Sequence, residues 1–88
     1  MPALAGDLVL TADDSAAEMR LMTSACVNPS TLTMLRHEWR ERFKAAHVTI
    51  GARAYAGCWI DDEGVAVILF ENGEQVQIEL AAFRSAAI

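Results

Sequence analysis

The residue types that could do chemistry are few and scattered along the 88-residue sequence. His37 and Glu41 are spaced one helical turn apart, as an acid–base pair or two metal ligands would be, but a helical wheel puts His47 on another side. No set of His and Cys residues has the spacing of a metal site. We therefore expect no catalytic residues, no metal and no cofactor, and a protein that is not an enzyme.

The two cysteines, Cys26 and Cys58, are far apart in the sequence. Cys58 lies in a strand-like run with no base beside it, which indicates a small buried hydrophobe rather than a nucleophile. Secreted scaffolds held by disulfides usually contain more cysteines, so we predict two reduced thiols in a cytoplasm. The N-terminus lacks the pattern of a signal peptide, and no apolar run could span a bilayer, so we expect a cytoplasmic location and no membrane partner.

Basic residues are concentrated in one segment. The formal net charge is −5, whereas residues 32–53 carry +3. On a helical wheel, one flank of this segment could bind a phosphate or an acidic protein, and its residues are Arg36, Arg40, Lys44 and His47. The alternative is a solvated edge whose long side chains cover apolar neighbours. The negative overall charge and the absence of a known nucleic-acid-binding motif weigh against nucleic acid as the partner.

Two helices are expected to carry the first half of the chain. The first, at about 12–26, begins with N-cap chemistry at Thr11 or Ser15 and ends before Pro29. The second, at about 30–46, has Asn28 or Ser30 as its cap. It places apolar residues along one helical face: Leu32, Leu35, Trp39, Phe43 and Ala46.

The second half of the chain has the pattern of an antiparallel meander, with strands at about 54–60, 65–71 and 74–80. Asn72-Gly73 is a strong signal for a two-residue hairpin turn. With that turn, Val67 faces Ile78, and a three-residue loop at 62–64 places Trp59 on the same face. The helices would cover this face.

The opposite face of the meander is apolar on two of its three strands, where a solvated face should alternate with polar residues. Either the N-terminal half of this chain or another chain must cover it. We predict this second face as a partner interface formed by Cys58, Ile60, Ile68, Phe70, Gln75 and Gln77.

The sequence thus predicts one α+β domain over residues 1–88, with two N-terminal helices packed on a three-stranded antiparallel β-meander. A fourth short strand could come from 8–10 or 48–50. Hydrophobic residues make up 53% of the chain, which is enough for a core, but so short a chain leaves much of its surface exposed.

We expect a small non-catalytic protein-binding or assembly module, homodimeric through the apolar face. The alternatives are a nucleic-acid-associated regulator that uses the basic flank, and an acidic inhibitor protein from a mobile element.

Overall fold

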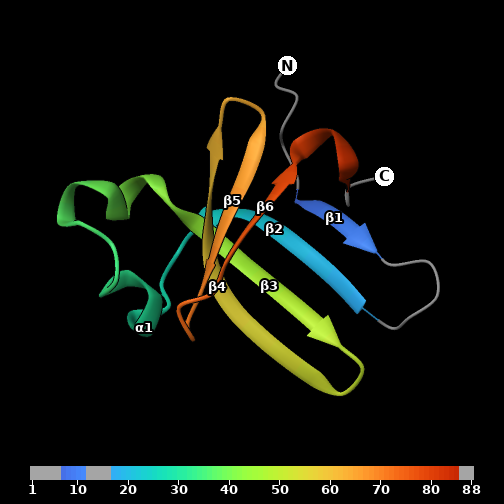
Figure 1. Ribbon diagram of the computed structural model, residues 1–88, viewed down its shortest axis with the longest axis horizontal. Coiled ribbons are helices and arrows are strands. Elements are labelled where there is room, and N and C mark those ends of the chain that lie inside the picture. Colours follow the sequence, from blue (N-terminus) through green and yellow to red (C-terminus); the bar gives the residue numbers. More distant parts are fainter. Residues whose placement is uncertain (1–6, 12–16, 86–88) are drawn as a thin grey trace.

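The computed structural model describes residues 7–11 and 17–85, and this part of the chain forms a curled antiparallel sheet of seven strands (Figure 1). The strands are β1 (Leu8–Thr11), β2 (Ala17–Ala25), β3 (Lys44–Ile50), β4 (Arg53–Asp62), β5 (Val65–Phe70), β6 (Gln75–Glu79) and β7 (Arg84–Ser85). Three short helical elements join them: α1 (Pro29–Leu32), η1 (His37–Arg42) and η2 (Leu80–Ala82). The strand order is β6-β5-β4-β3-β2-β1-β7, so two strands that are consecutive in the chain lie at opposite edges.

The predicted α+β fold, with two helices packed on a meander, is wrong. The first difference from the prediction is strand β2. Residues 17–25 of the predicted helix at 12–26 form a strand, while 12–16 and the proposed Ser15 cap lie outside the described residues. Met19 and Leu21 alternate with Arg20, which is the period of a strand. Pairing with β1 on one side and β3 on the other satisfies the backbone groups that a helix would have bonded internally.

The second predicted helix, at 30–46, is also wrong beyond its first turn. Of the two predicted caps, Asn28 is the one that caps α1, since its Oδ1 accepts hydrogen bonds from the Thr31 amide and hydroxyl at 2.9 and 3.0 Å. The helix ends at Leu32, and after η1 the chain becomes β3. In β3, Ala46 and Val48 are buried and alternate with more exposed residues, and the strand pairs on both edges.

The three predicted meander strands are present as β4, β5 and β6, but their register differs by one residue. The loop at 71–73 holds three residues, because the Phe70 amide donates to the Glu74 carbonyl at 2.8 Å and only Gly73 has a positive φ. Glu63-Gly64 is the two-residue turn, with φ values of 54° and 89°. The first loop therefore has two residues where three were predicted, and the second has three where two were predicted.

This shift of one residue exchanges the two faces of β5. Ile68 is opposite both Trp59 and Val76, so it lies on the face that we call the inner face. The buried residues of the main core on this face are Leu21, Ala46, Trp59, Ala66, Ile68 and Phe83. Cys58 and Ile60 lie on the other side, which we call the outer face.

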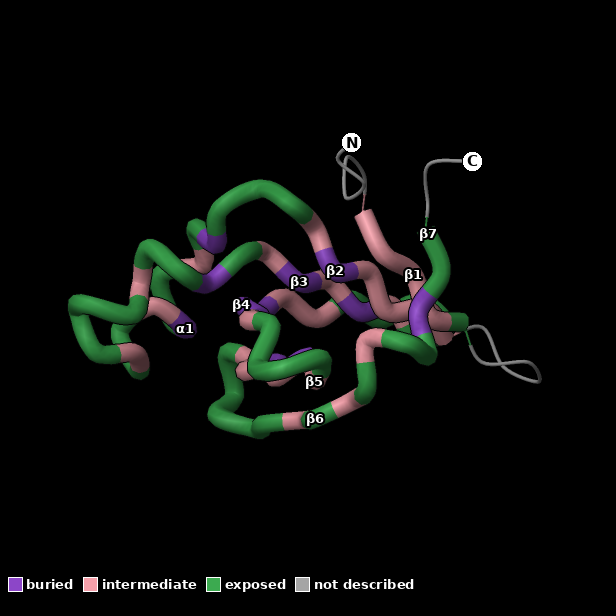
Figure 2. Tube along the Cα trace, turned by 90° about the horizontal axis from the view of Figure 1, so that it is seen from above, coloured by how far each residue is buried: buried purple, intermediate pink, exposed green. Residues whose placement is uncertain are grey.

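The sheet encloses its core by folding over on itself. Figure 2 shows β2 and β3 in one layer and β5 and β6 in another, with buried positions along β2, β3 and β5. The long strand β4 belongs to both layers, because it pairs with β3 over residues 53–59 and with β5 over residues 57–62. Gly57 lies where the two pairings overlap. A Cβ atom there would collide with the Leu69 carbonyl and lie 3.2 Å from the Phe70 Cα.

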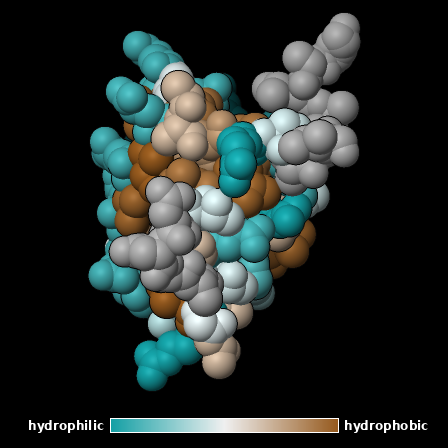
Figure 3. All heavy atoms as spheres, turned by 90° about the vertical axis from the view of Figure 1, so that its right-hand side faces the viewer, coloured by the Kyte–Doolittle hydropathy of each residue, from teal (hydrophilic) through white to brown (hydrophobic). Residues whose placement is uncertain are grey.

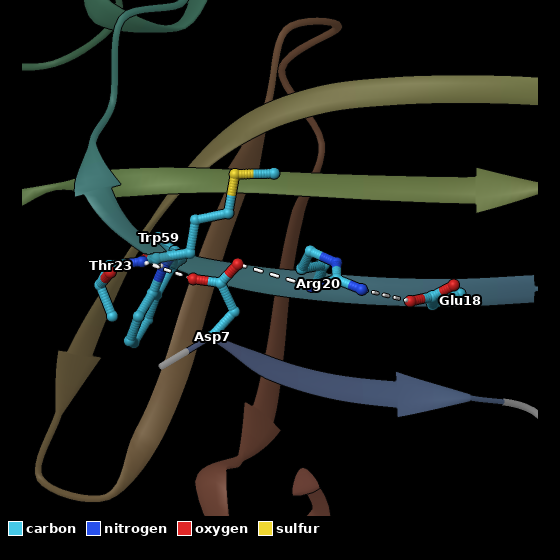
Figure 4. Close-up of polar contacts among 6 residues, drawn as sticks. Asp7, Glu18, Arg20, Thr23 and Trp59 are labelled. Atoms are coloured by element: carbon cyan, nitrogen blue, oxygen red, sulfur yellow. Dashed lines mark hydrogen bonds and ion pairs between the residues drawn. The ribbon is translucent and has the colours of Figure 1, made fainter. Parts of the chain in front are cut away.

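Polar contacts fix the N-terminal strands against β4 (Figure 4). The Asp7 carboxylate accepts a hydrogen bond from the Thr23 amide at 3.2 Å and forms an ion pair with Arg20 at 3.5 Å. The Trp59 indole N–H donates to the Met22 carbonyl at 2.9 Å. The buried indole nitrogen of Trp59 is therefore satisfied.

Candidate functional site

A disulfide between Cys26 and Cys58 attaches the loop after β2 to the outer face of the sheet. Their Cα atoms are 5.4 Å apart although 32 positions separate the two residues in the sequence. The prediction of two reduced thiols is therefore wrong. No local sequence signal could have paired them, because the curl of the sheet and the path of the loop decide their proximity.

Residues 26–43, which we call the outer segment, cover part of the outer face. Their buried members Cys26 and Phe43 pack with Cys58 in a second hydrophobic cluster, and the partly buried residues around it are Leu32, Leu35 and Ile60. The apolar residues whose spacing predicted a helix thus pack on the outer face without forming one. Leu32 at the end of α1, Leu35 in the loop that follows and Phe43 directly after η1 all pack toward the sheet.

A groove of about 620 Å³ remains between the outer segment and the ends of β4 and β5. We call it the outer groove, and its apolar lining consists of Met34, Leu35, Trp39, Phe43, Ile60 and Val67. Four charged residues complete it: Arg36 and Arg42 from the outer segment, and Asp61 and Asp62 from β4. The groove therefore combines an apolar floor with charges of both signs.

Trp39 is the exposed aromatic residue of this groove. Its side chain belongs to η1 and is 41% exposed, and the Arg42 guanidinium lies 5.1 Å from the centre of its ring. Such a contact orients the two side chains together. Neither Arg36 nor Arg42 forms an ion pair with another described residue. The two arginines thus have no anionic partner in the described part of the chain, while the Asp61 carboxylate accepts one hydrogen bond, from the Gly64 amide at 2.9 Å.

Trp39 was predicted on the apolar face of a helix, turned toward the sheet, and its exposure is a correction to that prediction. The signal that could have revealed it is its immediate context, since residues 37–42 read His-Glu-Trp-Arg-Glu-Arg. An indole within so charged a run is poorly placed for burial. Met34, 44% exposed, was also not singled out.

The six residues of the predicted partner interface are divided between the two faces. Cys58 and Ile60 lie on the outer face, and Gln75 and Gln77 are exposed at the edge strand β6. Ile68 and Phe70 belong to the inner core, and Ile68 is fully buried. Val67 and Leu69, which pair with Ile60 and Cys58, take their places on the outer face.

The four residues of the predicted anion-binding flank are not aligned, because the helix that would align them is absent. Arg36 precedes η1, and Arg40 within η1 donates to the Leu35 carbonyl at 3.2 Å. Lys44 begins β3 and lies 5.9 Å from the Trp59 ring. His47 is opposite Arg20 in the sheet. Arg36 is the one of the four that lines the outer groove.

Within residues 7–11 and 17–85, no group of three or more His, Cys, Asp or Glu side chains is placed to hold a metal ion. None of the helices in the described part of the chain has the length and apolar character needed to cross a membrane. The sequence matches no known family model, no curated protein and no solved structure.

Proposed function

We propose that this protein is a small non-catalytic assembly module that forms a homodimer through the outer groove. The observation that carries the proposal is the exposed Trp39 beside Arg42, above an apolar floor. Tryptophan and arginine are the residues that most often dominate the energy of protein interfaces. An apolar centre bordered by polar groups is the usual anatomy of such a surface.

The charges of the groove support a second copy of this chain as the partner. Arg36 and Arg42 line one wall, and Asp61 and Asp62 line the other. In a two-fold dimer each patch meets its own copy, so a surface that carries both signs can be complementary to itself. The arginines of one copy would then pair with the aspartates of the other.

The exposed apolar residues of the outer segment also support self-association. Val27 is 77% exposed and Met34 is 44% exposed, and both belong to the same segment as Trp39. A monomer gains nothing from leaving these side chains in water, whereas burial against a second copy contributes about 25 cal/mol for each Å² of apolar surface.

The test is the molar mass in solution by light scattering over a concentration series. We expect a dimer for the wild type and a monomer for Trp39→Ala. Charge-reversal variants test the proposed pairing of arginines with aspartates more sharply. Arg36→Asp/Arg42→Asp and Asp61→Arg/Asp62→Arg should each be monomeric alone and form a heterodimer when mixed. A wild type that stays monomeric at millimolar concentration would refute the proposal.

The same groove gives some support to the alternative of a nucleic-acid-associated regulator. An exposed indole flanked by Arg36 and Arg42 resembles the stacking surfaces that bind single strands. Asp61 and Asp62 on the facing wall repel phosphate, which favours the dimer. Binding of a single-stranded oligonucleotide at low salt, lost steeply as salt rises and lost in Arg36→Ala/Arg42→Ala, would support the alternative instead.

A cytoplasmic location, which the sequence predicts, conflicts with the Cys26–Cys58 disulfide. Disulfides persist in oxidising compartments and are rare in the cytoplasm. The two assignments are separated by quenching native cells with acid and alkylating the denatured protein, because both cysteines are buried in the fold. A cytoplasmic protein should be alkylated on both cysteines, whereas a protein in an oxidising compartment should show no added mass.

A further inference from the structure

A second cavity opens on the inner face, on the opposite side of the sheet from the outer groove. It measures about 580 Å³, and we call it the inner pocket. Five apolar residues line it: Met19, Val48, Ile50, Tyr55 and Phe70. Its remaining lining comes from the turn between β5 and β6, with Glu71, Asn72 and Glu74. Figure 3 views the molecule from the side where β3 ends and β4 begins, and hydrophobic atoms lie at the surface there between hydrophilic ones.

The pocket exists because β3 and β4 extend farther than the strands that cover them. On β4, the pairing with β5 begins at Gly57, so Tyr55 has no partner on β5. The alternation of β3 still directs Val48 and Ile50 to the inner face. With no covering strand, Ile50 remains 52% exposed. The end of this hairpin therefore presents an apolar surface that the chain leaves open.

The polar side of the inner pocket is acidic. Glu74 is the backbone hydrogen-bond partner of Phe70, and its Oε1 accepts from the Asn72 side chain at 2.9 Å. Glu71 accepts from the Asn28 side chain at 3.1 Å. Neither carboxylate forms an ion pair with a described residue, and no lysine or arginine lines the pocket. The nearest base in the register is Arg53, opposite Ile50 at the tip of the hairpin.

We propose that the inner pocket binds an amphiphilic organic cation, meaning an alkyl or aryl group that carries an ammonium. The apolar part would bury against Val48 and Ile50. The ammonium would lie near Glu74 and the rings of Tyr55 and Phe70, because a cation is attracted both by carboxylates and by aromatic faces. The volume lies within the range of about 300–1,000 Å³ that is typical of small-molecule sites. This inference does not depend on the outer groove or on dimer formation.

The experiment is isothermal titration calorimetry with decyltrimethylammonium below its micelle concentration, compared with decyl sulfate and decanol. The three probes share one chain and differ in charge. We expect the cation to bind more tightly than the alcohol, and the alcohol more tightly than the anion. Amide chemical shifts should move at residues 48–55 and 70–74. An anion that binds as tightly as the cation, or no binding of the cation at millimolar concentration, would overturn the proposal.

Charge variants locate the site. Glu71→Gln/Glu74→Gln should weaken cation binding about two- to tenfold, in line with partly exposed ion pairs. Arg53→Gln should leave it unchanged or strengthen it. The matched control Glu63→Gln/Glu79→Gln removes the same charge from positions that do not line the pocket, and should change the affinity less than twofold. Equal losses in the two glutamate double variants would mean a non-specific charge effect and would refute the site.

Discussion

The Cys26–Cys58 disulfide gives the most direct test of the structure, because reduction removes one constraint and leaves every side chain in place. The bond closes a loop across 32 sequence positions. For a loop of that size the chain-entropy relation gives a stabilisation of about 3.7 kcal/mol at 25 °C. Domains of this kind have a total free energy of unfolding of about 5–15 kcal/mol. Reduction should therefore remove a quarter or more of the stability.

The assay is urea unfolding followed by tryptophan fluorescence, with and without the reductant TCEP. We expect the free energy of unfolding to fall by about 3–4 kcal/mol, and the melting temperature to fall by roughly 15–30 °C for a chain of this size. The main core on the inner face does not include either cysteine, so the reduced protein should keep its far-ultraviolet circular dichroism at 25 °C.

The control is Cys26→Ala/Cys58→Ala, whose stability should not respond to TCEP. This variant should also be somewhat less stable than the reduced wild type, since both sulfur atoms are lost from a buried cluster. A change of less than about 1 kcal/mol on reducing the wild type would refute the reasoning. It would mean either that the two thiols are not joined or that the outer segment is held without them.

Three further predictions test the register and the core. Gly57→Ala should destabilise the protein by about 1–3 kcal/mol, because the added methyl collides with the Leu69 carbonyl; urea unfolding measures this loss. Trp59→Phe should cost about 1–3 kcal/mol, since the Met22 carbonyl loses its donor, and thermal unfolding reports it. Glu63→Gly should stabilise the protein by about 0.5–1 kcal/mol in urea, because Glu63 has a positive φ that glycine adopts without penalty.

Each of these variants has a matched control. Ala54→Val adds bulk at an exposed position of the same strand as Gly57 and should leave stability unchanged. Trp39→Phe removes an exposed indole that makes no hydrogen bond with a described residue, and should likewise have no effect on the monomer. Glu38→Gly, within η1, should destabilise rather than stabilise. If a variant has the same stability as its control, the observation behind it is contradicted: the close approach at Gly57, the hydrogen bond of Trp59 or the positive φ of Glu63.

The strands of the meander were predictable because their signals are local. β4, β5 and β6 each combine an apolar or alternating run with turn residues at both ends, and the chain needs no distant partner to express that pattern. The Asn28 cap before Pro29 is local for the same reason: a side chain bonds a backbone amide three residues away.

The strand β2 and the first part of β3 were predicted as helix, because their apolar residues fit both periods. Residues 8–10 and 48–50 were each predicted as a possible short strand, and both lie in strands, β1 and β3. Met19, Met22 and Cys26 match a helical face, while Met19 and Leu21 match one face of a strand. Such a segment takes the structure that its neighbours offer. The strands β2 and β3 each bond a neighbour on both edges, and their pairing with each other joins segments that residues 26–43 separate in the sequence.

The sequence by itself determined where three strands and one helix cap lie, and that no familiar catalytic motif is present. Only the tertiary structure decided which face each residue of β5 occupies. A change of one residue in the length of a loop is a small local difference, but it moves every side chain of the strand to the other face of the sheet. It also decided that Cys26 meets Cys58 and that Trp39 faces solvent. These outcomes depend on contacts between segments that are distant in the chain and adjacent in space. The same contacts form the outer groove and the inner pocket, the two sites of the proposed functions.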